Sequence, residues 1–329
     1  MLMLEKIDMT EQPLLSVRNF TLEYKTRKGY VSAVDDVSFD LATGQAMGLV
    51  GESGCGKTTI AMALLRLSPD NAVVRQGQIL LDDQDLLQLD DRQMRDVRWA
   101  RISMVFQAAM NALDPVYRVG DQIVEALLRH RHHLTPAETR QRVIELFQLV
   151  GIDPEMASRY PHEFSGGMRQ RAVIAMALAC NPSLIVADEP TTALDVIVQD
   201  QVLRELRRIQ QEMGMSMIYI SHDIAVIAEV ADRIGVMYAG RMVELADTRT
   251  IFQSPRHPYT AALLSSFPSI VGPRTDLVAL PGDPPDLLMP PAGCRFHPRC
   301  PFVTEQCMQE KPCLESVGRD HWAACWNLR

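Results

Sequence analysis

The chain has 329 residues, of which 33 are Lys or Arg and 41 are Asp or Glu, so its net charge is −8. This length is enough for one large domain with an appendage, or for two domains. A net negative charge gives the protein no positive surface potential with which to bind nucleic acid. The sequence contains no run of 18 apolar residues, so no membrane-spanning helix is predicted. Charge within the first eight positions, where a signal peptide needs its apolar core, predicts a cytoplasmic protein.

The first third of the chain has the pattern of strands. Apolar runs separated by polar turns predict antiparallel strands that lead into a glycine-rich loop, and residues 77–86 resemble a further hairpin. Residues 25–29 look like an inserted loop. A later apolar run predicts a strand that ends at Gln107. Besides the hairpin, the expected strands cover 14–18, 33–41, 45–50 and 102–106.

Residues 111–181 change to a helical pattern. One helix is expected over 121–130. Thr135 and Glu138 have the spacing of a capping box, Pro136 occupies the first helical position, and Gly151 closes that helix. A third helix is expected over 165–179.

The second half alternates buried strands with helices, and this predicts an α/β fold with a parallel sheet covered on both faces. From about residue 268, Pro, Gly and Cys become dense, which predicts a separate appendage with little apolar core. Before that point we expect strands at 183–187 and 217–221, helices at 196–213 and 225–230, and a hairpin formed by 233–238 and 241–245.

Residues 51–58, here called the phosphate loop, fit the pattern G-x-x-x-x-G-K-[ST]. A short apolar strand precedes the loop and an apolar helix over 59–67 follows it. This context favours a nucleotide site over an ordinary glycine turn. Lys57 is expected to reach the β- and γ-phosphates, and the Thr58 hydroxyl to bind Mg²⁺. The other expected nucleotide contacts are Gly51, Ser53, Gly54, Cys55, Gly56 and Thr59.

Asp188 and Glu189 follow an apolar run of five residues. A carboxylate there meets the phosphate loop at the carboxyl edge of the sheet, where α/β folds bind ligands. We expect Asp188 to bind Mg²⁺ and Glu189 to orient the attacking water. The alternative is a pair of acids at a helix N-terminus.

Ser165, Gly166 and Gly167 begin a helix and so predict a second anion-binding helix start. One nucleotide can use both starts if two subunits face each other head to tail. At this point the chain resembles the nucleotide-binding subunits of ABC transporters, over about residues 14–250. The resemblance rests on the phosphate loop, Gln107, 165–167, 188–189, 193–195 and His222, in the family order. Phe164 and Met168 depart from the commonest form of the 165–167 motif.

The resemblance implies a P-loop NTPase (RecA-like) parallel core with an antiparallel β subdomain and an α-helical subdomain over about 111–181. Gln107 would touch the metal or the attacking water, Asp195 would bridge two subunits, and His222 would contact the γ-phosphate. Tyr24 is the candidate for stacking on adenine, with Tyr30 as the competitor. Residues 107–120 would form part of a groove for the membrane partner; an ordinary surface loop is the alternative.

The tail narrows the resemblance. Residues 256–264, 280–282 and 293–301 look like the ATPases of oligopeptide and dipeptide importers (Opp/Dpp-type), whose relatives also import nickel or oligosaccharides. Cysteines crowd this tail, and four thiolates can hold a [4Fe–4S] cluster or Zn²⁺. The absence of C-x-x-C spacing weakens zinc, and disulfides are the remaining alternative. The resemblance implies a cluster on Cys294, Cys300, Cys307 and Cys325, with Cys313 as a spare.

These features together predict the ATP-binding and ATP-hydrolysing subunit of a membrane importer, most simply one for peptides. The expected partners are two integral membrane permease subunits, a second ABC ATPase subunit (itself or a paralogue) and, indirectly, an extracytoplasmic solute-binding protein, but no nucleic acid. The expected location is the cytoplasmic face of the inner membrane. The expected domains are 1–250, which binds nucleotide, and the C-terminal extension, 251–329. A soluble ABC ATPase without a membrane partner is the alternative.

Overall fold

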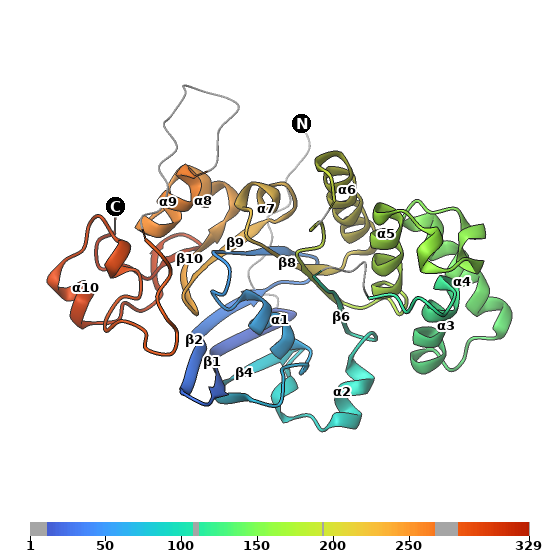
Figure 1. Ribbon diagram of the computed structural model, residues 1–329, viewed down its shortest axis with the longest axis horizontal. Helices are drawn as coiled ribbons and strands as arrows, with labels where there is room; N and C mark the ends of the chain where they lie inside the picture. Colours follow the sequence, from blue (N-terminus) through green and yellow to red (C-terminus); the bar gives the residue numbers. More distant parts are fainter. Residues whose placement is uncertain (1–11, 108–111, 193, 267–281, 329) are drawn as a thin grey trace.

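The computed structural model describes residues 12–107, 112–192, 194–266 and 282–328 (Figure 1). The smaller of its two sheets is antiparallel, as predicted. Only Arg27 and Lys28 separate its first two strands, so the inserted loop expected at 25–29 is wrong: the strands pair across it as a hairpin. The strand order is β2 (Gly29–Leu41), β1 (Leu15–Thr26), β4 (Ala72–Leu81) and β5 (Gln84–Asp85).

The larger sheet forms the centre of the molecule. Its order, within the described residues, is β11 (Glu315–Gly318), β12 (His321–Ala323), β10 (Arg241–Asp247), β9 (Arg233–Tyr238), β3 (Ala46–Val50), β8 (Ser216–Ser221), β7 (Leu184–Asp188) and β6 (Ile102–Val105). The strands from β9 to β6 are parallel. Every residue of β3, β7 and β8 is buried, because helices cover both faces of a parallel sheet. The predicted fold class is confirmed.

The C-terminal extension is not a separate unit. Its strand β12 pairs antiparallel with β10, through Glu244 opposite Ala323 and Leu245 opposite Trp322, and β11 pairs antiparallel with β12. The expectation of a separate appendage is therefore wrong, because the extension adds two strands to the main sheet instead of building its own. The boundary at residue 250 stays a prediction.

The helices follow the predicted order. α1 (Lys57–Leu64) follows β3, α6 (Val196–Met213) joins β7 to β8, and α7 (Ile224–Val230) joins β8 to β9. A helical group lies at one end of the molecule (Figure 1) and consists of α3 (Val119–His130), α4 (Pro136–Leu149) and α5 (Gly166–Ala177). The remaining α-helices of the described residues are α2 (Asp91–Val97), α8 (Thr248–Gln253), α9 (Pro258–Ser265) and α10 (Glu305–Gln309). None of the described helices combines the length and apolarity needed to cross a bilayer.

Local sequence signals explain where several helices begin. The capping box predicted at α4 is confirmed: the Thr135 hydroxyl accepts from the Glu138 backbone, and the Glu138 carboxylate accepts from the Thr135 backbone N–H (2.7 Å). Ser165 caps α5, and Asp195 caps α6 through the N–H groups of Ile197 and Val198 (3.1 and 3.0 Å).

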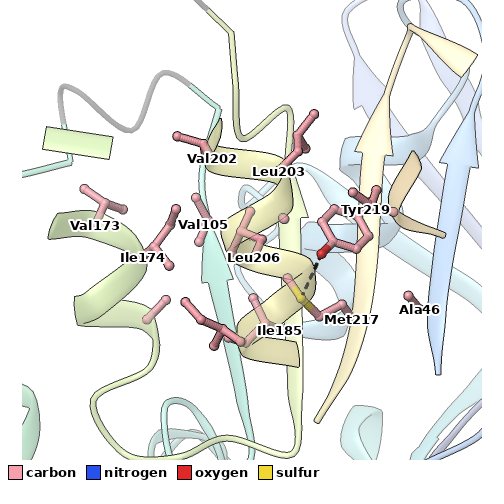
Figure 2. Packing of buried hydrophobic residues seen from close by; sticks show 14 of the residues in the cluster. Ala46, Val105, Val173, Ile174, Ile185, Val202, Leu203, Leu206, Met217 and Tyr219 are labelled. Carbon is pink, nitrogen blue, oxygen red and sulfur yellow. Dashed lines mark hydrogen bonds between the residues drawn. The ribbon is translucent and has the colours of Figure 1, made fainter. Parts of the chain in front are cut away.

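The main core lies between the helical group and the sheet (Figure 2). Val173 and Ile174 of α5 face Val105 of β6, and α6 packs its apolar face against the strands. On β8, the buried Tyr219 hydroxyl donates to the Met217 sulfur (3.1 Å). This packing fixes the ends of β6, β7 and β8 relative to one another, and those ends carry the site described next.

Candidate active site

The phosphate loop lies between β3 and α1 and has a shape that requires glycine. Gly51 has φ 153°, and a Cβ there would lie 2.1 Å from the Met237 carbonyl oxygen. Gly56 has φ 103°, and its Cβ would lie 2.4 Å from the Ala33 carbonyl oxygen. Any larger residue would push the backbone away, so these glycines let the loop turn tightly against β9 and β2.

Lys57 is buried under this loop. Its Nζ donates to the carbonyl oxygens of Gly51 (2.6 Å) and Glu52 (2.9 Å) and lies 3.4 Å from the Cys55 sulfur. Burial raises the pKa of Cys55, so its thiol is neutral. A buried ammonium whose hydrogen bonds go to neutral groups is suited to bind an anion. The exposed loop residues, which a ligand can reach, are Ser53, Gly54 and Thr58.

Asp188 ends β7 and is buried beside Thr58. Burial raises the pKa of Asp188, and a hydrogen bond from the Thr58 side chain opposes this shift. Within the described part of the chain, Asp188 Oδ1 has no hydrogen-bond partner. An orphaned carboxylate oxygen beside an exposed hydroxyl fits the oxygen ligands that Mg²⁺ requires. Gln107, the third predicted ligand, uses its amide N–H on Glu189.

Glu189 is held from three sides. Its carboxylate receives hydrogen bonds from Gln107 Nε2 (2.9 Å) and the Thr192 hydroxyl (2.8 Å), and lies 3.0 Å from His222 Nδ1. Burial raises the pKa of Glu189, but the hydrogen bonds from His222 and Thr192 outweigh it, so the net shift is downward. Glu189 also has φ 46°, a left-handed backbone uncommon outside glycine. An ionised carboxylate is thus fixed at the sheet edge.

The two candidate adenine-stacking residues differ in surroundings. The Tyr24 hydroxyl donates to Thr59 Oγ1 (3.2 Å) in the first turn of α1, so its ring stands next to the phosphate loop. The Tyr30 ring is more exposed, and the Arg75 guanidinium lies 4.3 Å from its centre. The contact with α1 supports Tyr24.

Ser165, Gly166 and Gly167 form the start of α5, which packs against α3, α4 and α6 and stands apart from α1 (Figure 1). The Ser165 hydroxyl accepts from the Met168 N–H (3.3 Å). Asp195 is exposed at the start of α6, next to Val196 and Ile197, which are 80% and 72% exposed. The structure therefore does not bring these residues to the phosphate loop of their own chain. Residues 108–111 of the expected partner groove lie outside the described residues.

Comparisons with known proteins agree with this geometry. Residues 34–192 match the model of the ABC transporter family, and residues 243–307 match that of the oligopeptide/dipeptide transporter C-terminal region. The dipeptide transport ATP-binding protein DppD of Bacillus subtilis (strain 168) is 46% identical over 318 residues, covering 96% of this chain and 95% of that protein. The chain belongs to the oligopeptide/dipeptide group of ABC transporter ATP-binding proteins. This ABC protein is an ATPase.

Further relatives support the same assignment. The oligopeptide transport ATP-binding protein OppD of Bacillus subtilis (strain 168) is 43% identical to this ABC protein, with 96% of this chain and 89% of OppD covered. Among solved structures, the dimeric bacterial ABC transporter cassette MJ0796 matches with a TM-score of 0.64 and 28% identity, covering 71% of this chain and 99% of that one.

The tail cysteines of this ABC protein approach one another without forming a site for a single metal ion. Among the described residues, no three His, Cys, Asp or Glu side chains are gathered closely enough to hold one. The pKa of Cys294 is raised to about 11, chiefly by burial and in smaller part by the nearby thiols of Cys307, Cys325 and Cys300, against a hydrogen bond from the Phe296 backbone. Cys313 is exposed, whereas Cys307 is buried and Cys294, Cys300 and Cys325 are partly buried.

Two contacts of the site were missed by sequence reasoning. Thr192 follows Glu189 by three residues, and that spacing could have suggested the hydrogen bond between them. Arg299 of the C-terminal extension binds Glu52 of the phosphate loop, and no local signal connects residues 247 positions apart.

Proposed function

We propose that this ABC ATPase drives the uptake of dipeptides or oligopeptides through a membrane transporter. The relatives at 43–46% identity, which are dipeptide and oligopeptide transport ATP-binding proteins, support this substrate class over nickel and oligosaccharides. The single observation that carries hydrolysis is the placement of the Glu189 carboxylate, held between Gln107, Thr192 and His222 at the edge of the sheet that carries the phosphate loop.

The phosphate loop and Lys57 bind the phosphates of ATP, and Tyr24 stacks on adenine. Thr58 and Asp188 hold Mg²⁺, which when bound neutralises charge on the phosphate oxygens. Glu189 orients the attacking water, with His222 and Gln107 fixing its carboxylate. Because Gln107, Thr192 and His222 hold the Glu189 carboxylate in place, it is preorganised for hydrolysis.

A complete site needs a second ATPase subunit. The residues at the start of α5 contact the nucleotide of the partner subunit, and Asp195 lies at the junction between the two subunits. Exposed Val196 and Ile197 supply apolar area there. Closing of the two subunits around ATP turns the membrane subunits outward, and hydrolysis resets them. The chain acts as a peripheral subunit on the cytoplasmic face of the inner membrane, beside two permease subunits.

The test is reconstitution of the chain with its permease subunits and second ATPase subunit in lipid vesicles, together with the solute-binding protein. We expect dipeptides or oligopeptides to raise the ATPase rate severalfold, and nickel or oligosaccharides to leave it unchanged. Stimulation by nickel or a sugar alone would contradict the substrate class. Purification of the chain without membrane subunits under gentle extraction would contradict the transporter assignment.

For the tail we propose a [4Fe–4S] cluster on Cys294, Cys300, Cys307 and Cys325. A cluster takes one thiolate on each iron, so its ligands stand farther apart than those of one zinc ion. Two observations support the pairing of Cys294 with Cys307 in this set. The Cys294 N–H donates to the Cys307 carbonyl (2.8 Å), and a Cβ on Gly293 would lie 2.4 Å from the same oxygen, so the two segments are pressed together.

Metal analysis of anaerobically purified protein tests the cluster. We expect about four irons and four acid-labile sulfides per chain, with a broad visible absorbance band. A Cys300→Ser variant should lose most of the iron, whereas the matched Cys313→Ser variant should keep it. One zinc and no iron would contradict the proposal.

A further inference from the structure

The segment from Cys294 to Cys300 lies directly against the phosphate loop. The buried Phe296 ring packs against both Tyr238 of β9 and Tyr259 of α9, with ring centres 5.1 and 5.4 Å away. The Tyr259 hydroxyl accepts a hydrogen bond from the Glu52 backbone N–H (3.0 Å). The C-terminal extension, red and orange in Figure 1, thus touches the loop at Glu52.

Arg299 makes the strongest of these contacts. Its guanidinium binds both oxygens of the Glu52 carboxylate: Nη1 lies 2.7 Å from Oε2, and Nη2 lies 3.0 Å from Oε1. Nη1 also donates to the Tyr238 hydroxyl (3.3 Å). The Arg299 side chain is 6% exposed and that of Glu52 is 26% exposed. A bidentate ion pair shielded from water holds the carboxylate in one orientation and compensates its charge far better than a surface ion pair does.

Glu52 is the only carboxylate in the sequence of the phosphate loop. Its carbonyl oxygen accepts from Lys57 Nζ (2.9 Å), while its N–H is bound by Tyr259 and its carboxylate by Arg299. The backbone N–H, the carbonyl oxygen and the carboxylate of Glu52 therefore each have a hydrogen-bond partner. Without Arg299, a negative charge would stand unpaired in a loop whose task is to bind phosphates, and it would repel them.

We propose that Arg299 is a positioning residue for ATP binding. It acts through Glu52, whose charge it neutralises and whose carboxylate it holds while also donating to the Tyr238 hydroxyl. The inference goes beyond the transport function, because it rests on nucleotide binding at the phosphate loop and not on the transported solute or the metal content of the tail.

The first experiment measures Mg²⁺–ADP affinity of the purified full chain by calorimetry, and KM for ATP against kcat in the assembled transporter. Arg299→Gln should weaken nucleotide binding and raise KM about tenfold, equivalent to about 1.4 kcal/mol, with kcat changed less than twofold. The matched control is Arg319→Gln, an arginine of the same extension with a side chain 96% exposed, which should leave both constants unchanged. Unaltered affinity in Arg299→Gln would overturn the proposal.

A rescue variant shows whether Arg299 acts by neutralising Glu52 or only by stabilising the fold. The double variant Arg299→Gln/Glu52→Gln carries no unpaired carboxylate, so its KM should return to within about threefold of the natural protein. If Arg299 only stabilised the fold, the double variant would bind nucleotide no better than Arg299→Gln. That result would refute the charge mechanism.

Should Arg299→Gln fail to fold, Glu52→Gln alone decides the question. It keeps the Arg299 guanidinium and removes a negative charge from the phosphate loop, so nucleotide affinity should rise. A tenfold loss of affinity in Glu52→Gln would show that the carboxylate is needed for itself, contrary to the proposal.

Discussion

The parallel strands around Asp188 and the C-terminal extension around Phe296 are stabilised by different means. The strands β3, β7 and β8 bury every residue, and their polar active-site groups begin only where the strands end. The extension has short strands and relies on the buried rings of Tyr259 and Phe296 and on buried arginines: Arg295 pairs with Asp35 (2.6 Å) and Arg299 with Glu52 (2.7 Å). Catalytic groups can therefore change without cost to the core, whereas the extension and the phosphate loop depend on each other.

The largest effect is expected at the edge of the core. Glu189→Gln keeps the size of the side chain but removes the charge that orients water, so kcat should fall about 10²- to 10⁴-fold. ATP should still bind, and the closed dimer should accumulate. The thermal midpoint should hardly move, because Glu189 lies outside the buried strands. Normal turnover by this variant would remove Glu189 from the mechanism.

In the extension, by contrast, we expect a substitution to lower the stability of the fold. Phe296→Ala deletes a ring that is 2% exposed and packs on Tyr238 and Tyr259, so unfolding should become easier by about 3–5 kcal/mol. Denaturant unfolding measures this loss, and hydrogen exchange should show the earliest opening in β11 and β12. A loss below about 1 kcal/mol would mean that the ring does not anchor the extension.

The next largest effect is expected when the pH is lowered, which should destabilise the extension through His257. Burial lowers the pKa of His257, at the start of α9, to about 3, compared with about 6.5 in an unfolded chain. Between pH 3 and pH 6.5 the His257 side chain binds a proton in the unfolded state but not in the folded state. Stability should therefore be complete above about pH 6.5 and fall by about 1.4 kcal/mol per unit toward pH 3.

His257→Asn is the control for this pH effect. His257 Nδ1 accepts the Tyr259 N–H (3.0 Å), and Asn can cap the same helix start without titrating. The difference in stability between natural protein and variant should shrink as the pH falls from 6.5. A difference that is constant with pH would contradict the assigned titration.

The smallest effect is expected on the exposed face of α6. Arg204 pairs with Asp200 (2.8 Å), but its side chain is 79% exposed. Solvent screens such a pair, so Arg204→Ala should change stability by less than about 0.5 kcal/mol. A larger loss of stability would mean that this exposed ion pair contributes as much as the buried arginine pairs of the extension.

Much of the core was predictable because its signals are local. The run 183–187 became β7 (Leu184–Asp188), and the helix expected at 196–213 became α6 with the same bounds. The carboxyl ends of parallel strands meet at one edge, so Gln107, Glu189 and His222 could be expected together. The structure places all three in contact. The inserted loop at 25–29 was misjudged because charged and turn residues there resemble a loop, although two strands pair across it.

The phosphate loop and the order of strands and helices follow from residues close together in the chain, and the residues of the sheet edge were predictable because each comes just after a strand. Only the tertiary structure decided that β12, three residues long, continues the main sheet, and that Arg299 reaches Glu52. Those contacts join segments up to 247 residues apart. The edge of β10 has backbone groups for β12 to pair with, and the buried Arg299 needs a charged partner, but spacing along the chain encodes neither contact.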